Sequence, residues 1–273
     1  FIKKNIFNIP IICVGNIYVG GTGKTPTSIL LANEITKLDK RPVILRKFYK
    51  NHQDEYELIK NNFKNFISSK NRFEAIKKIE DSEFDVVILD DGLQDYKIKK
   101  NLNIVCFNQN QLLGNGLILP SGPLRESLSS LKDVEIVIIN GIKNKDFEDK
   151  ILNINKNLKV FYSHYKPINL NDFKNKKLFA LAGIGNPENF FQLIEENNLK
   201  IMKKFIYPDH YKFTIKEIQR ILKQAEDEKA EIIMTEKDFY KLKNFKLNKL
   251  NFLKVSLEID KKNELLQIIQ KNL

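Results

Sequence analysis

The feature that most constrains this chain is a glycine-rich turn between an apolar, strand-like run at Pro10–Val14 and a helical stretch at Pro26–Leu38. The turn ends in Lys24-Thr25 and contains three glycines: Gly20, Gly21 and Gly23. Glycines let a backbone curl until successive N–H groups converge on one anion, and the positive end of the following helix adds to the attraction. The pattern therefore predicts a phosphate-binding loop (P-loop) joining a strand to a helix.

The end of the turn indicates a nucleoside triphosphate. Lys24 supplies a charge for the β- and γ-phosphates, and Thr25 supplies a hydroxyl ligand for Mg²⁺. The strict P-loop pattern has glycine where this chain has Tyr18. A glycine-rich strand-to-helix turn without a ligand is the alternative interpretation. We expect six residues to contact the nucleotide: Gly20, Gly21, Thr22, Gly23, Lys24 and Thr25.

The composition suits a folded chain with an anionic partner. The 273 residues are 42% hydrophobic, enough for a substantial core, and the length suits two modest domains. The formal net charge is +12, which biased use of lysine explains as well as an anionic partner does. Cys13 and Cys106 each lie within apolar residues, so we expect buried thiols in a reducing cytosol. No apolar run approaches the roughly 18 residues needed to span a bilayer.

Short runs rich in Ile and Val alternate with helical patterns along the first part of the chain. The runs are Pro10–Val14, Pro42–Leu45, Phe84–Leu89, Asn103–Phe107 and Val134–Ile139. Such runs are typical of parallel strands buried on both faces. A second alternation begins near Lys177, after a polar connection at Tyr165–Lys176. We therefore expect an α/β fold, a P-loop NTPase-like parallel sheet flanked by helices, with a second, smaller α/β domain. The expected domains are residues 1–168, which bind the nucleotide, and residues 169–273, which close the substrate cleft.

Paired carboxylates follow the apolar run at Phe84–Leu89. The acid that completes a P-loop metal site ends such a strand, and successive strand residues point to opposite sides. Either Asp90 or Asp91 is then placed to hold Mg²⁺ while the other orients a loop or a substrate. An aspartate turn with Gly92 is the alternative.

A loop of interleaved glycine, proline, leucine and isoleucine, Leu113–Leu124, leads into Arg125-Glu126. Its composition predicts an ordered, shaped loop. Arg125 is suited to clamping phosphate and stabilising charge during transfer, and Glu126 to completing a Mg²⁺ shell. An exposed ion pair that opens a helix is the alternative for these two residues.

Other polar residues have ordinary interpretations when taken alone. His210 is interpreted as a residue at a helix entry, and His52 and His164 have no evident role. Asp54 and Glu55 are interpreted as a solvated charge pair in a polar loop. The chemistry of Thr235–Asp238 cannot be deduced from the chain.

Taken in order, VGNIYVGGTGKTP, DDGLQ, GNGLILPSGPLRE, PDHY and TEKD closely resemble the tetraacyldisaccharide 4′-kinases, the lipid A kinases of Gram-negative bacteria. The resemblance extends from Pro10 to about Leu242. It implies ATP-dependent transfer of the γ-phosphoryl group to the 4′-hydroxyl of a lipid A disaccharide 1-phosphate. It also implies peripheral association with the cytoplasmic face of the inner membrane, and it explains Tyr18, since the family's loop generally lacks that glycine.

The resemblance assigns roles to individual residues. Lys24 and Thr25 match the P-loop pair. Asp90 and Asp91 match the acidic motif, and Arg125 and Glu126 match the RE pair. His210 matches the family's DH motif and Asp54 its DE motif, a pair that accepts the proton of the sugar hydroxyl. The implied metal ligands are Thr25, Asp90, Asp91 and Glu126, and the implied cofactors are ATP and Mg²⁺.

The chain departs from the family around Arg46–Lys50, where an S-R-G-Y-G-R-like stretch and an insertion are usual, so Asp54 is the loosest match. Two other functions stay open. One is a membrane-associated ATPase that uses the loop to change conformation and needs no acceptor. The other is a nucleic-acid-binding module, which only the +12 charge suggests; we expect no nucleic-acid partner.

Overall fold

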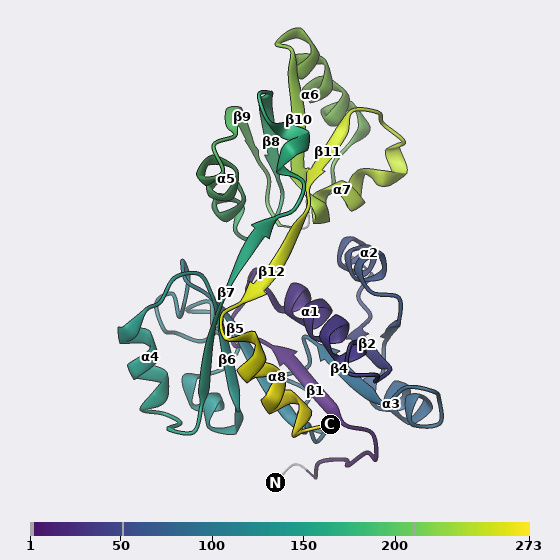
Figure 1. The fold of residues 1–273 in the computed structure, drawn as a ribbon, viewed down its shortest axis with the longest axis vertical. Helices are drawn as coiled ribbons and strands as arrows, with labels where there is room; N and C mark the ends of the chain where they lie inside the picture. Colours follow the sequence, from purple (N-terminus) through teal and green to yellow (C-terminus); the bar gives the residue numbers. More distant parts are fainter. Residues whose placement is uncertain (1–2, 51, 210) are drawn as a thin grey trace. The chain divides into compact units, whose positions relative to one another are not determined.

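The structure is a computed structural model that describes residues 3–50, 52–209 and 211–273. The chain forms two compact units (Figure 1). The first comprises Phe1–Tyr49, Ile59–His164 and Leu257–Leu273, and the second comprises Lys50–Leu58 and Tyr165–Ser256. Both units are α/β, as the sequence predicts.

The sheet of the first unit is built around the strand that precedes the P-loop. Eight strands take the order β12-β7-β6-β5-β1-β4-β2-β3. Their bounds are β1 Ile11–Gly15, β2 Pro42–Lys47, β3 Phe66–Ser69, β4 Val86–Asp90, β5 Leu102–Asn108, β6 Ile136–Asn140, β7 Lys159–Pro167 and β12 Val255–Ile259. From β3 to β7 every neighbouring pair is parallel, so the carboxyl ends of these strands share one edge.

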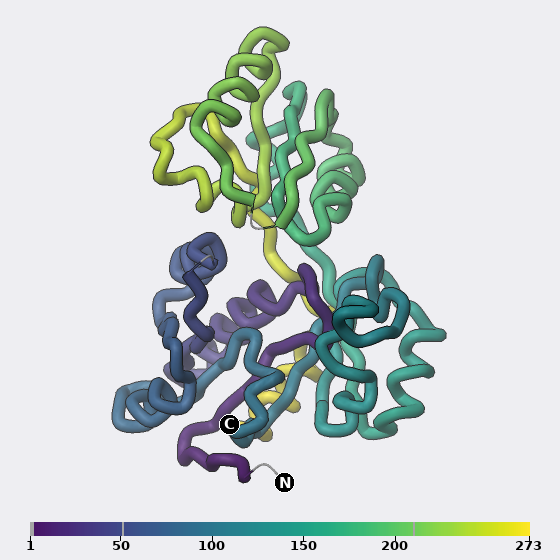
Figure 2. The backbone as a smooth tube through the Cα atoms, turned by 180° about the vertical axis from the view of Figure 1, so that it is seen from behind, coloured from purple at the N-terminus to yellow at the C-terminus, as the bar shows by residue number. Residues whose placement is uncertain are grey.

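Helices cover both faces of this sheet. Their bounds are α1 Lys24–Thr36, α3 Arg72–Glu80, α4 Lys145–Leu152 and α8 Lys262–Gln270, with a 3-10 helix η1 at Leu128–Asp133. A further helix, α2 Gln53–Asn62, begins in the second unit and enters the first at Ile59. Ile12 and Val14 of β1 pack in one core with α1 and α8, whereas Ile11 and Cys13 pack in a second core with α3 and α4. Strand residues alternate between faces, so a continuous apolar run such as β1 supplies both cores. Figure 2 shows α8, in yellow, behind the sheet.

Both cysteines confirm the predicted buried thiols. Cys13 belongs to one core and Cys106 to the other, and neither forms a disulfide. Burial raises the pKa of each thiol to about 12. Neither sulfur is therefore a nucleophile near neutral pH.

The second unit repeats the α/β plan on a smaller scale. Four parallel strands take the order β11-β10-β8-β9, with bounds β8 Lys177–Ala182, β9 Lys200–Ile206, β10 Ala230–Thr235 and β11 Leu250–Leu253. The helices are α5 Pro187–Glu196, α6 Ile215–Asp227 and α7 Glu236–Leu242, with 3-10 helices η2 Leu170–Phe173 and η3 Lys243–Phe245. Phe191 of α5 packs on one face of the sheet and Ile221 of α6 on the other. Thr214 and Glu217 form a capping box at the start of α6, which satisfies backbone donors there.

The division of the chain differs from the expected domains, 1–168 and 169–273, at its C-terminal end. Residues 257–273 belong to the first unit. The reason is the apolar face of α8, where Leu265 and Ile269 are fully buried in the core that also contains Ile12. Residues spaced by four lie on one helix face, so this short helix completes the first unit's core. Residues 50–58 differ in the opposite sense, because they belong to the second unit.

Candidate functional site

The P-loop lies at the carboxyl edge of the first sheet, at the point where the strand order reverses. β1 has β4 on one side and β5 on the other, so the chain crosses over β1 between them. Ligands of open α/β sheets bind outside the carboxyl ends of the strands at such a crossing. Polar side chains from β2, β4 and β5 and from the loop that follows β1 meet here, and they make up the candidate site.

Backbone geometry makes two glycines of the loop necessary. Gly20 has φ +133° and Gly23 has φ +86°, values that residues with a Cβ rarely adopt. The loop is fastened by a hydrogen bond from Asn16 Nδ2 to Thr22 Oγ1 (3.3 Å) and by another from Asn108 Nδ2 to the carbonyl of Gly21 (3.3 Å). The loop is therefore shaped by the protein itself.

Tyr18 replaces the missing glycine without blocking the loop. Its side chain is fully buried in the first unit's core beside Phe107, and its hydroxyl accepts a hydrogen bond from the backbone N–H of Asn108 over 2.8 Å. The ring points into the core rather than toward a ligand, so the departure from the strict pattern is structural.

Helix α1 begins directly after the loop. Gly23 is its N-cap residue, no side chain caps it by a hydrogen bond, and its first turn contains no acidic residue. The first N–H groups of a helix have no partner within the helix and carry the positive end of its dipole. This helix end is therefore suited to phosphate.

Thr25 and Asp90 meet at the base of the loop. Thr25 Oγ1 donates a hydrogen bond to Asp90 Oδ2 (3.1 Å), and Ser28 Oγ donates one to Asp90 Oδ1 (3.1 Å). Asp90 is fully buried at the end of β4. These contacts hold an oxygen pair, Thr25 Oγ1 and an Asp90 carboxylate oxygen, in fixed geometry.

Arg46 joins the same group and was not among the predicted site residues. Its Nη1 donates to Thr25 Oγ1 over 3.1 Å and also contacts the Asp90 carboxylate. β2 and β4 are neighbours in register, with Arg46 opposite Asp90, and only 4% of Arg46 is exposed. A charged residue near the end of an apolar strand was the available signal, but the pairing of β2 with β4 was needed to interpret it.

Asp91 points away from Asp90 toward two cations. Its carboxylate accepts hydrogen bonds from Arg125 Nη1 at 3.1 and 3.3 Å, and Lys24 Nζ lies 3.7 Å away. Burial alone would raise the pKa of Asp91, but the charges of Lys24 and Arg125 outweigh burial and lower it. Lys24 and Arg125 thus converge on one anion beside the P-loop, as they would on a phosphate group.

The loop at Leu113–Leu124 is tied to the P-loop by backbone hydrogen bonds. Val19 N donates to Pro123 O (2.8 Å), and Arg125 N donates to Ile17 O (2.7 Å). These contacts fix where the Arg125 side chain starts.

Gln94 also lies at the site and was not among the predicted site residues. Its Nε2 donates to Asn16 O (3.1 Å) and to Glu126 Oε1 (2.7 Å), so one amide links the P-loop to the residue after Arg125. The signal was its place in the DDGLQ motif, four residues after Asp90.

The four predicted metal ligands are only partly brought together. Thr25 and Asp90 are in contact, whereas Asp91 contacts Lys24 and Arg125, and Glu126 contacts Gln94. Among the described residues, no group of three or more His, Cys, Asp or Glu side chains is arranged to hold a metal ion. Mg²⁺ needs only one or two carboxylates, with phosphate and water as further ligands, so the oxygens of Thr25 and Asp90 fit it.

Asp54 belongs to the second unit and lies beside two lysines of α7. Its Oδ2 is 3.6 Å from Lys237 Nζ and 3.9 Å from Lys241 Nζ, and only 6% of the residue is exposed. Lys237 also pairs with Glu55 (3.5 Å) and Asp209 (3.0 Å). Burial alone would lower the pKa of Lys237, but the carboxylates of Glu55, Asp209 and Asp54 outweigh burial and raise it. The sequence analysis expected a solvated charge pair here. The structure instead has a partly buried ionic cluster made up of Asp54, Glu55, Asp209, Lys237 and Lys241.

His210, the expected partner of Asp54, lies outside the described residues. His52 pairs with Glu55 (2.9 Å), and His164 lies 3.4 Å from Glu258. Neither contact involves a residue predicted to act in catalysis or to bind nucleotide or metal. The two contacts therefore give no role to His52 or His164.

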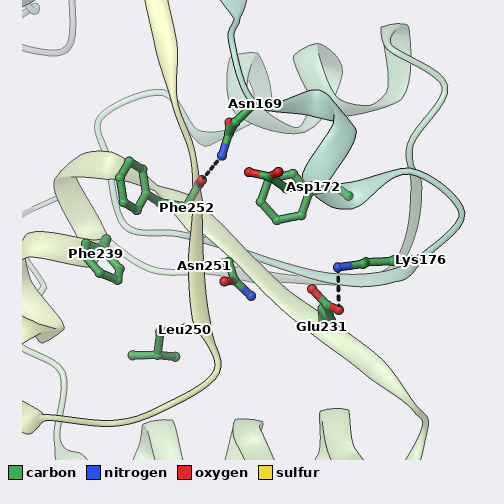
Figure 3. A pocket seen from close by; sticks show the side chains of 9 residues that line it. Asn169, Asp172, Lys176, Glu231, Phe239, Leu250, Asn251 and Phe252 are labelled. Atoms are coloured by element: carbon green, nitrogen blue, oxygen red, sulfur yellow. Dashed lines mark hydrogen bonds and ion pairs between the residues drawn. The ribbon is translucent and has the colours of Figure 1, made fainter.

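A separate cavity of about 240 Å³ lies in the second unit (Figure 3). Phe239 and Phe252 form part of its wall, and Lys176 pairs with Glu231 across 2.8 Å. Among the described residues, none that lines this cavity was predicted to act in catalysis or to bind nucleotide or metal.

Comparison with known proteins gives matches to a family model, to relatives and to a solved structure. The model of the family described as tetraacyldisaccharide-1-P 4′-kinase matches residues 1–273. The tetraacyldisaccharide 4′-kinase of Pelagibacter ubique is 41% identical over 271 residues, covering 97% of this chain and 86% of that protein. The enzyme of the same name from Francisella tularensis subsp. tularensis is 34% identical over 291 residues, covering 95% and 88%.

Among solved structures, LpxK from Aquifex aeolicus in complex with ATP has a similar fold. The TM-score is 0.73 at 22% identity, over 99% of this chain and 90% of that one.

Proposed function

Because this chain belongs to the tetraacyldisaccharide-1-P 4′-kinase family, we propose that its P-loop holds ATP while the γ-phosphoryl group passes to the 4′-hydroxyl of a tetraacyldisaccharide 1-phosphate. The chain is a kinase of lipid A biosynthesis that uses ATP. The observation that carries the proposed site is the convergence of Lys24, Arg125 and the uncapped start of α1 beside Asp90 and Asp91.

In this proposal the first unit binds and orients the triphosphate. The loop N–H groups and α1 hold the phosphates, Lys24 neutralises the transferring group, and Arg125 stabilises the charge that spreads over its oxygens. Thr25 and Asp90 would hold Mg²⁺, which supplies further charge neutralisation, while Asp91 keeps Lys24 and Arg125 aligned. Phosphoryl transfer needs little covalent help, so positioning and charge account for most of the catalysis.

Asp54 is proposed to accept the proton of the acceptor hydroxyl. Two lysines, at 3.6 and 3.9 Å, favour its ionised form, which is the form a general base needs. Only 6% of the residue is exposed, which limits its contact with bulk water. The role of His210 as the partner of Asp54 stays a prediction.

The acceptor is an acylated disaccharide, so the enzyme must work at a bilayer surface. No helix in the described part of the chain is long and apolar enough to cross a membrane. We propose peripheral association with the cytoplasmic face of the inner membrane, supported by the formal net charge of +12, which favours an anionic surface.

The direct test follows γ-phosphate from labelled ATP with tetraacyldisaccharide 1-phosphate present or absent. We expect acceptor-dependent transfer, and phosphorus NMR of the product should place the new phosphate on the 4′-oxygen. Lys24→Met should abolish transfer. Hydrolysis of ATP at the same rate without acceptor would instead support a nucleotide-driven switch and contradict the proposal.

A further inference from the structure

The loop that leads to Arg125 ends in an exposed apolar tip, Leu117–Leu119. The exposed fractions are 51% for Leu117, 46% for Ile118 and 52% for Leu119. Val19 of the P-loop, 46% exposed, is joined to the same loop by its hydrogen bond to Pro123. Large apolar side chains gathered on one surface mark a site of interaction, whereas scattered ones do not.

The tip is rigidly built, so its exposure is part of the folded structure. Leu119 N donates to Leu124 O (2.8 Å), and Leu124 N donates to Leu117 O (3.1 Å). Asn115 closes the loop by donating to Ser121 O (2.9 Å). A Cβ at Gly122 would lie 2.2 Å from the Asn115 side chain, so glycine is needed for the loop to close.

The chain around the tip is uncharged. Residues 101–124 contain no Asp, Glu, Lys, Arg or His, in a chain that is 29% charged. Charges are costly to bury in hydrocarbon, and so are unpaired backbone groups. The tip lowers both costs, because it has no charge and most of its backbone groups, such as Leu117 O, Ile118 O and Leu119 N, bond within the loop.

We propose that Leu117, Ile118 and Leu119 insert into the interfacial layer of an anionic phospholipid bilayer and seat the P-loop unit at the membrane. The inference rests on the proposed function, since an acceptor with four acyl chains resides in a bilayer. The chain's +12 charge supplies attraction to anionic headgroups, and the uncharged tip supplies apolar anchoring. Arg125 is the first charged residue after the tip, so the anchor and the phosphate clamp belong to one loop.

A fluorescent reporter tests insertion directly, because the chain contains no tryptophan. Ile118→Trp places a probe in the tip. Ile6→Trp is the matched control, since Ile6 is 74% exposed and precedes β1, at the opposite edge of the same sheet. With phosphatidylglycerol vesicles carrying brominated acyl chains, we expect a blue shift and quenching of the probe at position 118 and neither at position 6. An unquenched probe at position 118, or equal quenching at both positions, would overturn the proposal.

Vesicle sedimentation measures the contribution of the tip. The triple variant Leu117→Ser, Ile118→Ser, Leu119→Ser should bind phosphatidylglycerol vesicles about tenfold or more weakly than the wild type, since membrane binding scales with buried apolar area. Ile6→Ser should bind normally, and ATP binding should be unchanged in both variants. Unchanged vesicle binding by the triple variant sinks the proposal. If the same variant also dissociates an oligomer in light scattering, the tip contacts a second copy of the chain instead of a bilayer.

The two proposals can fail separately. Phosphoryl transfer to detergent-dispersed acceptor tests the kinase function without a bilayer. If the wild type transfers no phosphoryl group but binds vesicles through the tip, the kinase proposal is rejected and the membrane-insertion proposal is retained. If transfer is normal but vesicle binding does not depend on the tip, the kinase proposal is retained and the membrane-insertion proposal is rejected.

Discussion

Arg46 Nη1 donates a hydrogen bond to Thr25 Oγ1 over 3.1 Å and shares with Thr25 the carboxylate of Asp90. A buried guanidinium from β2 thus organises the oxygen pair that we propose for Mg²⁺. Removing one partner of a buried ion pair leaves the other charge uncompensated, which is far more costly than losing an exposed pair.

Arg46→Met should therefore lower the free energy of unfolding by about 3–5 kcal/mol at neutral pH. Urea denaturation measures the change. Arg41→Met is the matched control, since Arg41 pairs with Asp85 (3.3 Å) at the surface of the same unit and should give no measurable loss. Equal effects of the two variants would mean that the Arg46 contact contributes little.

Gly23→Ala should destabilise the protein by about 1–2 kcal/mol, because alanine at φ +86° is strained. Gly21→Ala should leave thermal stability nearly unchanged, since a Cβ there meets no atom within 4 Å. Calorimetry without nucleotide isolates this backbone effect from any effect on phosphate binding. If both variants have the same melting temperature, the left-handed backbone conformation at position 23 does not contribute to stability.

Asp91 should make stability depend on acid pH. Its pKa is lower in the folded protein than in the unfolded chain, so the unfolded state binds the proton more readily and stability rises with pH across this range. The stabilisation is complete above the unfolded pKa of about 3.9 and is lost as pH falls through the lower folded value.

The wild type should therefore be more stable than Asp91→Asn at pH 6, and the difference should shrink below about pH 4. Asparagine suits this test because it tolerates the left-handed backbone at this position, where φ is +58°. Urea titrations at several pH values provide the measurement. A difference that is constant across pH would show that the Asp91 charge contributes nothing to stability.

Asp54→Asn should slow phosphoryl transfer by about 10²–10⁴-fold, the usual contribution of a general base, with little change in ATP affinity. Glu55→Gln is the matched control, because Glu55 pairs with the same Lys237 but is not proposed to meet the hydroxyl. Turnover and ATP binding are measured separately. Similar losses in both variants would assign Asp54 to the ionic cluster rather than to catalysis.

Local patterns predicted much of the fold. The strands β1, β2, β4, β5 and β6 were expected within a few residues, because each is an apolar run buried on both faces. β3 and β7 were not expected. Phe66–Ser69 is short and half-buried, and Lys159–Pro167 alternates buried and exposed residues, so neither resembles a buried parallel strand.

The site divides in the same way. Lys24, Thr25, Asp90 and Asp91 could be selected from the sequence because the chemistry of each depends on its immediate neighbours: a glycine turn, a helix start or the end of a strand. Lys237 could not be selected, because its contact with Asp54 joins residues that are far apart in the sequence.

The sequence by itself determined the parallel α/β plan and the P-loop, because periodic burial and glycine torsions are local properties of the chain. Tertiary structure decided that Arg46 and Gln94 join the P-loop, that Lys237 and Lys241 surround Asp54, and that α8 completes the first core. Strand order and helix packing bring these residues together, and the free energy gained by burying distant apolar faces sets that order.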